Sequence, residues 1–187
     1  MAKRSSEEIN NQPCEYEDFN SKNEQHQSHQ IKKMAKLNLA NYDDGKVKIL
    51  GAGGIDVILE AMKTHPTIAE VQEDGCHALG YLASNNDDGK VKIVGAGGIE
   101  VILEAMKAHL TIAKVQEYGC YALAKLANHD NGKVKILGAG GIDVILEAMK
   151  AHLTIAEVQE DGCRALGNLA SNNDNGKVKI VEAGSIE

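Results

Sequence analysis

The sequence repeats itself with a period of 43 or 44 residues. The phrase GKVKI occurs four times along the chain, beginning at Gly45, Gly89, Gly132 and Gly176. Residues 45–88 and 132–175 match at 39 of 44 positions without a gap, and the middle copy, 89–131, is one residue shorter. A period of this length with helical content is typical of stacked helical repeats and not of a domain built around one compact core.

Each copy predicts three helical segments. In the first copy they are a short one at 45–53, a second at 54–65 and a third from Thr67 to about Ser84. The apolar residues of the second segment fall at i, i+3, i+4 and i+7, which places them on one helical stripe: Ile55, Ile58, Leu59 and Met62. One such unit cannot bury its own apolar faces, so its neighbours must supply the core.

The third segment is predicted to be the longest helix of the repeat. Its buried stripe is Ile68, Val71, Gly75, Ala78, Leu79 and Leu82. Thr67 and Glu70 have the spacing of a capping box, which predicts where the helix begins. The run of Asn and Asp at 85–88 then predicts a turn.

AGGIDVILEAM, followed by EVQEDGCRALGNLASNN, resembles the armadillo repeat, and the resemblance recurs in register over residues 45–187. It implies an all-α fold, a right-handed superhelical α-solenoid of armadillo-like three-helix repeats. It also implies a groove along the concave side, lined by the third helices, in which armadillo proteins bind extended peptides.

We predict the following organisation: a polar, flexible N-terminal tail at 1–30, a degenerate capping helix at 31–44, armadillo-like repeats at 45–88, 89–131 and 132–175, and an incomplete fourth repeat at 176–187. The tail is rich in Asn, Gln, Ser and Glu, a composition that favours disorder in isolation. Its acidic and aromatic segment CEYEDF, at 14–19, is complementary to Lys114, Lys125 and the paired tyrosines of the second repeat and is a candidate for docking in the groove.

The internal copies differ most at four positions of the third helix, spaced 4, 3 and 4 residues apart. This spacing places each set on one helix face, opposite the buried stripe. These are the candidate partner-binding residues: Glu70, Asp74, His77 and Tyr81; Lys114, Tyr118, Tyr121 and Lys125; Glu157, Asp161, Arg164 and Asn168. Free drift after duplication is the alternative, but the lysines of the GKVKI phrases and Lys63, Lys107 and Lys150 do not vary.

Other candidate sites have structural interpretations. The phrase GAGGID at 51–56 superficially resembles a phosphate-binding loop, yet it recurs in tandem and lacks the P-loop Lys-Ser/Thr pair, so it predicts a glycine turn. We expect Cys76, Cys120 and Cys163 to be small buried residues. We expect His65, His109 and His152 to interact with carbonyl groups at the end of the second helix.

No constellation for catalysis, cofactor binding or metal binding stands out, so the sequence predicts a protein that is not an enzyme. The formal net charge of −7 argues against nonspecific nucleic-acid binding. The chain has neither an apolar stretch that could cross a membrane nor the apolar core of a secretion signal. We therefore expect an intracellular protein, cytoplasmic or nuclear, with no membrane partner.

Together these features predict a non-catalytic scaffold or adaptor that binds an extended peptide segment of another protein along the ladder of third helices. The segment is expected to have mixed charge, with an acidic or aromatic residue anchored at the second repeat. The alternative is a structural subunit that assembles with itself through the incomplete C-terminal repeat, as a homo-oligomer or as part of a larger assembly.

Overall fold

The computed structural model describes residues 43–184, and every regular element in that range is an α-helix. The helices are α2 (Asp43–Gly51), α3 (Gly54–Thr64), α4 (Ala69–Ala83), α5 (Asp87–Gly95), α6 (Gly98–Ala108), α7 (Ala113–Leu126), α8 (Asp130–Gly138), α9 (Gly141–Ala151), α10 (Ala156–Ala170) and α11 (Asp174–Gly184). The predicted tail at 1–30, nearly all of the predicted capping helix at 31–44 and the last three residues lie outside the described range.

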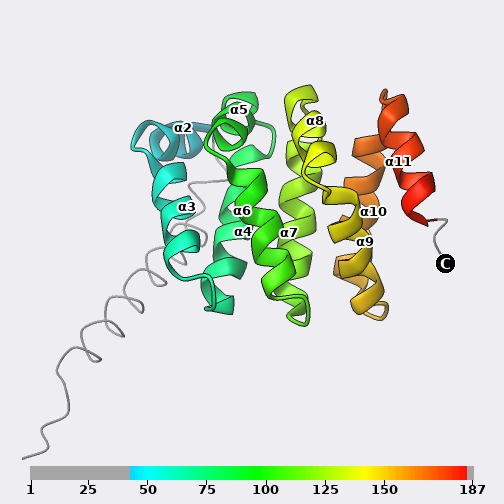
Figure 1. The fold of residues 1–187 in the computed structure, drawn as a ribbon. Helices are drawn as coiled ribbons and strands as arrows, with labels where there is room; N and C mark the ends of the chain where they lie inside the picture. The colour runs from blue at the N-terminus through cyan, green and yellow to red at the C-terminus, as the bar shows by residue number, and fades with distance from the viewer. Residues whose placement is uncertain (1–42, 185–187) are drawn as a thin grey trace, which may run out of the picture.

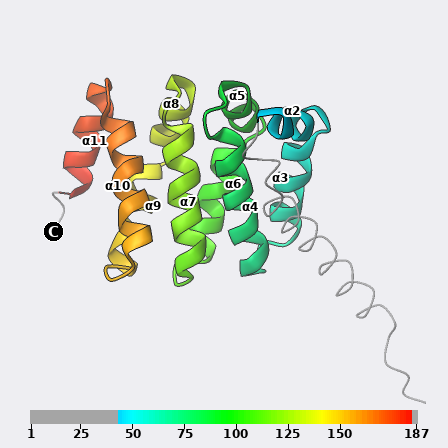
Figure 2. The ribbon, with the colours of Figure 1, turned by 180° about the vertical axis from the view of Figure 1, so that it is seen from behind.

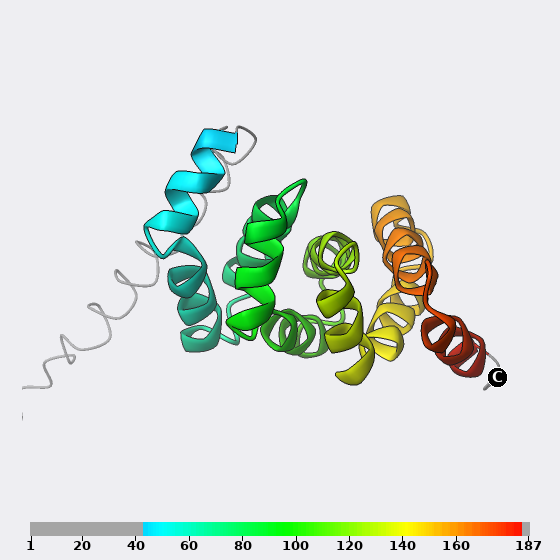
Figure 3. The ribbon, with the colours of Figure 1, turned by 90° about the horizontal axis from the view of Figure 1, so that it is seen from above.

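The helices form a row of triplets that follow one another in chain order (Figures 1 and 3). The second helices α3, α6 and α9 line one side of the row (Figure 1), and the third helices α4, α7 and α10 line the other (Figure 2). The third helices pack on one another far more extensively than the second helices do. This difference makes the third helices the inner layer of the stack, because neighbours lie closer together on the inner side of a curved array.

One continuous apolar core runs through the stack from Leu50 to Leu169. The predicted stripe of the second helix is buried throughout its length, with Ile58 and Met62 only 1% exposed. The third helix comes close to the second at Gly75, where an added Cβ would lie 2.5 Å from the Met62 sulfur. The core therefore belongs to the array and not to any single repeat, as repeat architectures require.

The turn between the first and second helices needs glycine, as the sequence predicts. Gly53, Gly97 and Gly140 precede α3, α6 and α9 with φ of 72°, 79° and 73°. This left-handed conformation costs glycine little and other residues more. The recurring GAGGID phrase is thus a structural corner.

The first helices begin two residues earlier than the GKVKI phrase indicates. Each starts at an Asp, and the Asn86 side chain accepts a hydrogen bond from the Gly89 N–H at 3.1 Å, which caps α5. Asn173 caps the Gly176 N–H in the same way at 3.0 Å. Because each capping side chain lies three residues before the phrase, the phrase alone cannot mark the start of the helix.

The predicted capping box at Thr67 and Glu70 is wrong. Ile68 occupies the N-cap position of α4 and no side chain there accepts a capping hydrogen bond. A buried glutamine instead ties α4 to the end of α3, because Gln72 Nε2 donates to the carbonyls of Met62 and His65 at 3.0 and 2.8 Å. Gln116 and Gln159 repeat this arrangement in the next two repeats.

The recurring histidines link neighbouring repeats. His109 Nε2 lies 2.7 Å from the Pro66 carbonyl oxygen of the first repeat, and His152 Nε2 lies 2.7 Å from the Leu110 carbonyl oxygen of the second. The sequence predicted contacts with carbonyls at the end of the same helix, and the structure places these contacts across the repeat boundary. An interaction between repeats cannot be inferred from the sequence of one repeat.

Several of the invariant lysines also have structural partners. Lys46 donates to the Ser84 carbonyl at the end of α4, and Lys133 donates to the Ser171 carbonyl at 2.9 Å at the end of α10. Lys179 donates to the Leu137 carbonyl at 3.2 Å. These lysines are therefore poor references for free drift, and their constancy does not by itself make the variable third-helix positions functional.

The three cysteines of the repeats are not equivalent. Cys76 and Cys120 are fully buried, and burial raises the pKa of each thiol to about 12. Cys163 is exposed, so the prediction of burial is wrong there. Cys76 and Cys120 lie on third helices that are each followed by another, whereas within the described residues α10 is not.

Candidate functional site

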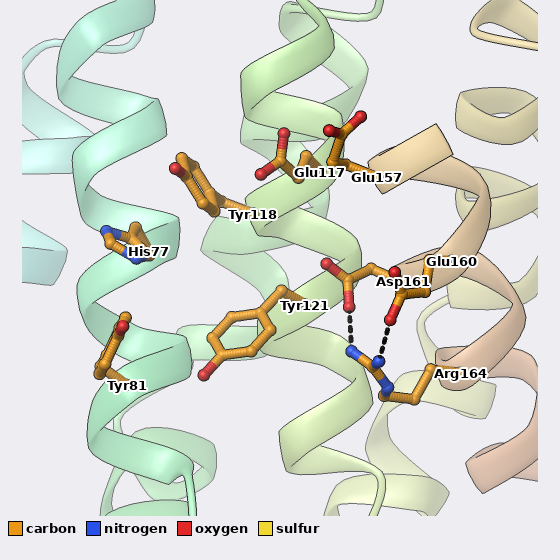
Figure 4. Close-up of a pocket in the computed structure, with 9 residues that line it drawn as sticks. All are labelled: His77, Tyr81, Glu117, Tyr118, Tyr121, Glu157, Glu160, Asp161 and Arg164. Atoms are coloured by element: carbon orange, nitrogen blue, oxygen red, sulfur yellow. Dashed lines mark hydrogen bonds and ion pairs between the residues drawn. The ribbon is translucent and has the colours of Figure 1, made fainter. Parts of the chain in front are cut away.

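A hollow of about 250 Å³ opens on the third-helix face between α4, α7 and α10 (Figure 4). One repeat alone could not form it, because each of the three helices supplies part of its wall. It is lined by His77, Tyr81, Glu117, Tyr118, Tyr121, Glu157, Glu160, Asp161 and Arg164.

Aromatic side chains from α4 and α7 form one wall of the hollow. The His77 ring stacks on the Tyr118 ring, with centroids 4.3 Å apart and planes inclined by 29°. The Tyr81 and His77 rings are nearly perpendicular, with centroids 4.7 Å apart. The centroids of the Tyr81 and Tyr121 rings lie 6.1 Å apart, with tilted planes. Such geometries are favoured by aromatic quadrupoles, so the four rings support one another and form a pre-organised apolar surface.

The absence of a side chain at Gly80 leaves room for the Tyr121 ring. A Cβ at Gly80 would lie 2.4 Å from Tyr121 Cδ1 and 3.2 Å from the Ala122 Cα, so α4 and α7 approach closely here. The corresponding glycine of the third repeat, Gly167, has nothing within 4 Å of an added Cβ. The same residue type thus serves different purposes in two copies of the repeat.

Carboxylates and one guanidinium form the opposite side of the hollow. Arg164 pairs with both Glu160 and Asp161 on its own helix (Figure 4). Glu117 of α7 and Glu157 of α10 also line the hollow (Figure 4). Glu117 pairs with Lys114 at 2.7 Å, so Arg164 and Lys114 balance two of the four carboxylates, and the hollow is suited to a cationic group near Glu157.

Two lysines of α7 lie against the tyrosine rings. Lys114 Nζ pairs with Glu117 at 2.7 Å and lies 5.5 Å from the Tyr118 centroid. Lys125 Nζ lies 4.9 Å from the Tyr121 centroid, one turn further along α7. Both are within the range of cation–π attraction, so each lysine holds a ring in place as well as carrying charge.

The enclosed position of these groups shifts their ionisation. Burial lowers the pKa of His77, against an opposing effect of Glu117, and Lys114 lowers it further. Burial raises the pKa of Asp161, although Arg164 acts in the opposite direction. Burial also raises the pKa of Tyr118 and Tyr121. The wall therefore carries neutral aromatic groups at neutral pH, with the carboxylates as the main charges.

The structure brings together seven of the twelve candidate binding residues in the wall of this hollow: His77, Tyr81, Tyr118, Tyr121, Glu157, Asp161 and Arg164. Lys114 and Lys125 support the wall through the rings. Glu70 is exposed near the start of α4, and Glu70 and Asp74 do not line the hollow. Asn168 Nδ2 donates to the Ala124 carbonyl at 2.9 Å, which ties α10 to α7.

Two residues of the wall, Glu117 and Glu160, were missed by the sequence reasoning. They are identical in the second and third repeats, and Glu73 is their counterpart in the first, so a search for positions that differ between copies cannot find them. The available signal was their spacing. Each lies three residues after a variable position, Lys114 or Glu157, and therefore on the same side of its helix.

Within residues 43–184, no group of three or more His, Cys, Asp or Glu side chains is arranged to hold a metal ion. None of the described helices is both long enough and apolar enough to span a bilayer.

Stacked three-helix repeats with a pre-organised inner face define an α-solenoid repeat scaffold. Residues 38–178 match the family model described as the LRRK2 ARM repeat, and the chain belongs to this armadillo-type family. The predicted fold class is thereby confirmed.

Two solved structures are similar to the chain. One is a crystal structure of an engineered protein, Northeast Structural Genomics Consortium target OR329, with TM-score 0.76 and 31% identity; the match covers 86% of this chain and 63% of that one. The other is a crystal structure of an engineered protein, target OR366 of the same consortium, with TM-score 0.74 and 27% identity, covering 86% and 64%. The chain thus spans less than two thirds of the length of either. No curated protein matches it.

Proposed function

We propose that the chain is a non-catalytic scaffold that binds an extended segment of a partner protein across the inner faces of α4, α7 and α10. The observation that carries this proposal is the hollow itself. Its walls come from three successive repeats, and most of its side chains occupy the positions at which the repeats differ. An extended segment that crosses the helices can contact all three, whereas a small molecule would use only one part of the surface.

The ring wall provides the anchor. Tyrosine offers a large rigid apolar surface with a hydroxyl group, and it loses little conformational entropy on binding. Tyr118 and Tyr121 are only half-buried and already held by His77 and Gly80. A flat or aliphatic side chain of the partner would complete their burial, and little reorganisation would oppose it.

The charges favour a segment of mixed composition. Glu157 would receive a basic side chain of the partner, and Lys125, one turn past Tyr121, would receive an acidic one. The pairing of Lys114 with Glu117 offsets the charge of that lysine, so a purely acidic anchor is less suited to this surface than an aromatic residue next to a basic one.

A peptide-display selection on the complete chain tests the proposal and does not require that the partner be identified. Peptides enriched on the native chain are measured against a variant in which Lys114, Tyr118, Tyr121 and Lys125 are all changed to Ala. We expect affinity to fall about 100-fold or more, because interface tyrosines carry much of the binding energy.

The matched control changes Lys63 and Lys107, two exposed residues of the second helices, to Ala. This control should leave binding unchanged, and circular dichroism should show the same helix content in all three proteins. Peptides that bind the fourfold variant as tightly as the native chain would contradict the assignment of the groove.

A further inference from the structure

His77 lies in the wall of the hollow, between the rings of two tyrosines. Its ring stacks on that of Tyr118, with centroids 4.3 Å apart, and is nearly perpendicular to that of Tyr81, with centroids 4.7 Å apart. The His77 side chain is only half-buried, so water reaches it and can deliver a proton. Because the charge of a histidine changes close to neutral pH, this otherwise uncharged wall gains a positive charge on acidification.

The charged groups around His77 come from three helices. On α7, Glu117 favours the protonated ring, whereas Lys114 opposes it. On α4, Glu73 and Asp74 precede His77 by about one helical turn. The second helices line the other side of the row, away from this wall (Figures 1 and 2). Across the hollow, α10 presents three carboxylates and one guanidinium (Figure 4): Glu157, Glu160, Asp161 and Arg164.

The state of this wall at neutral pH favours a cationic ligand. Burial outweighs the effect of Glu117 and holds the pKa of His77 below its ordinary value of 6.5, so the imidazole is neutral at pH 7.5. The hollow then keeps the negative charge that Arg164 and Lys114 leave unbalanced. A basic side chain that enters near Glu157 meets no opposing charge at His77.

We propose that the hollow holds a basic side chain of the partner at neutral pH and releases it on mild acidification, with His77 as the switch. This proposal rests on the scaffold function proposed above and adds its regulation. A protonated His77 and the ammonium or guanidinium group of the partner are like charges on two sides of one hollow. The protonated ring also offsets part of the negative charge that attracts the partner.

The size of the hollow sets the magnitude of the effect. For unit charges about 8 Å apart, the width of a compact hollow of about 250 Å³, and an effective dielectric constant of about 20, repulsion weakens binding at most about 30-fold. Solvent enters the hollow, and His77 is not fully protonated at pH 5.0. We therefore expect the affinity for a basic peptide to fall about threefold to tenfold between pH 7.5 and pH 5.0.

Fluorescence anisotropy at these two pH values tests the switch. The probes are a peptide that is enriched on the complete chain and carries one basic residue, and the same peptide with norleucine at that position. The native chain should lose affinity for the basic peptide as stated, and its weaker affinity for the norleucine peptide should stay constant. His77→Gln should hold the affinity for the basic peptide within about twofold over the same range.

Nuclear magnetic resonance adds a measurement that a purely structural histidine would not affect. By linkage, the basic peptide should lower the pH midpoint of the His77 ring titration in the native chain, because the bound cation opposes protonation. The norleucine peptide should leave the midpoint where it is.

Two further variants separate His77 from other groups that titrate. Asp161→Asn removes a carboxylate whose pKa burial raises, and it should weaken binding but keep most of the pH dependence. His109→Gln, at a histidine that contacts the Pro66 carbonyl at the end of α6, is the matched control and should behave like the native chain.

The outcomes distinguish the switch from the scaffold function. If the native chain binds the basic peptide equally well at both pH values, or if His77→Gln keeps the full pH dependence, the switch is overturned and the scaffold function stands. Enriched peptides that need no basic residue would also overturn the switch alone. A selection on the complete chain that enriches no binding peptide would overturn both.

Discussion

The pair Gly80 and Gly167 tests whether Tyr121 is packed as the structure shows. The two glycines occupy the same position of α4 and α10, yet a Cβ at Gly80 would lie 2.4 Å from Tyr121 Cδ1, whereas a Cβ at Gly167 would contact nothing within 4 Å. Replacing a glycine in a helix by alanine gains about 1 kcal/mol of helix propensity. Gly167→Ala should therefore stabilise the protein by up to about 1 kcal/mol.

Gly80→Ala gains the same propensity but overpacks the contact with Tyr121. Overpacking of a well-packed site costs about 1–3 kcal/mol, and the Ala122 Cα at 3.2 Å is backbone that cannot easily yield. The net effect should lie between neutrality and a loss of about 2 kcal/mol. The two variants should thus differ by about 1–3 kcal/mol in the free energy of unfolding.

Urea unfolding followed by circular dichroism measures this difference, and a double-mutant cycle assigns it. In a Tyr121→Ala background the ring is removed and only the Ala122 Cα at 3.2 Å remains close, so Gly80→Ala should become clearly less costly than in the native background. Because Gly80→Ala displaces the ring, it should also weaken peptide capture, whereas Gly167→Ala should not. Equal stabilisation by both substitutions in the native background would refute the packing of Tyr121 against α4, and with it the geometry of the ring wall.

Three further measurements check other features of the structure. Because burial holds the pKa of His77 below the ordinary value of 6.5, the folded state prefers the neutral imidazole. The stability that the neutral His77 imidazole contributes is complete above about pH 6.5 and is lost as the pH falls through the folded pKa. His77→Phe should therefore flatten the loss of thermal stability on acidification. Iodoacetamide labelling with mass mapping should modify Cys163 in the native protein and reach Cys76 and Cys120, with a pKa of about 12, only after denaturation. Gln116→Leu should lower the free energy of unfolding by about 1–3 kcal/mol, since it deprives the Met106 and His109 carbonyls of their buried donor; an unchanged urea midpoint would argue against that role.

Much of the fold could be predicted because its determinants are local and recur. The spacing of Ile55, Ile58, Leu59 and Met62 predicts the second helix, and all four are buried. The glycines of the GAGGID phrase predict a corner, and Gly53 does adopt a positive φ. By contrast, the capping box at Thr67 was wrong, because hydrogen bonds from Gln72 to carbonyls at the end of the preceding helix secure that part of the repeat.

The candidate site was predicted only in outline. Comparison of the copies found the helix face and seven of the residues that line the hollow. It could not find Glu117 or Glu160, because residues that are identical in neighbouring repeats carry no signal in a search for differences. It also could not foresee that Asn168 donates to a backbone carbonyl of the preceding repeat, because that contact spans 44 residues of sequence.

The amino-acid order by itself determined the three-helix unit and its period, because helix stripes, glycine corners and Asn caps act within a few residues. Only the stacking of the units decided what each copy of a residue does. Cys76 and Cys163 lie in nearly identical surroundings along the chain, yet one is buried and the other exposed. Val57 and Val101 likewise differ in exposure. Burial depends on what stands beside a helix in the array, and a residue's neighbours in space are not encoded by its neighbours in sequence.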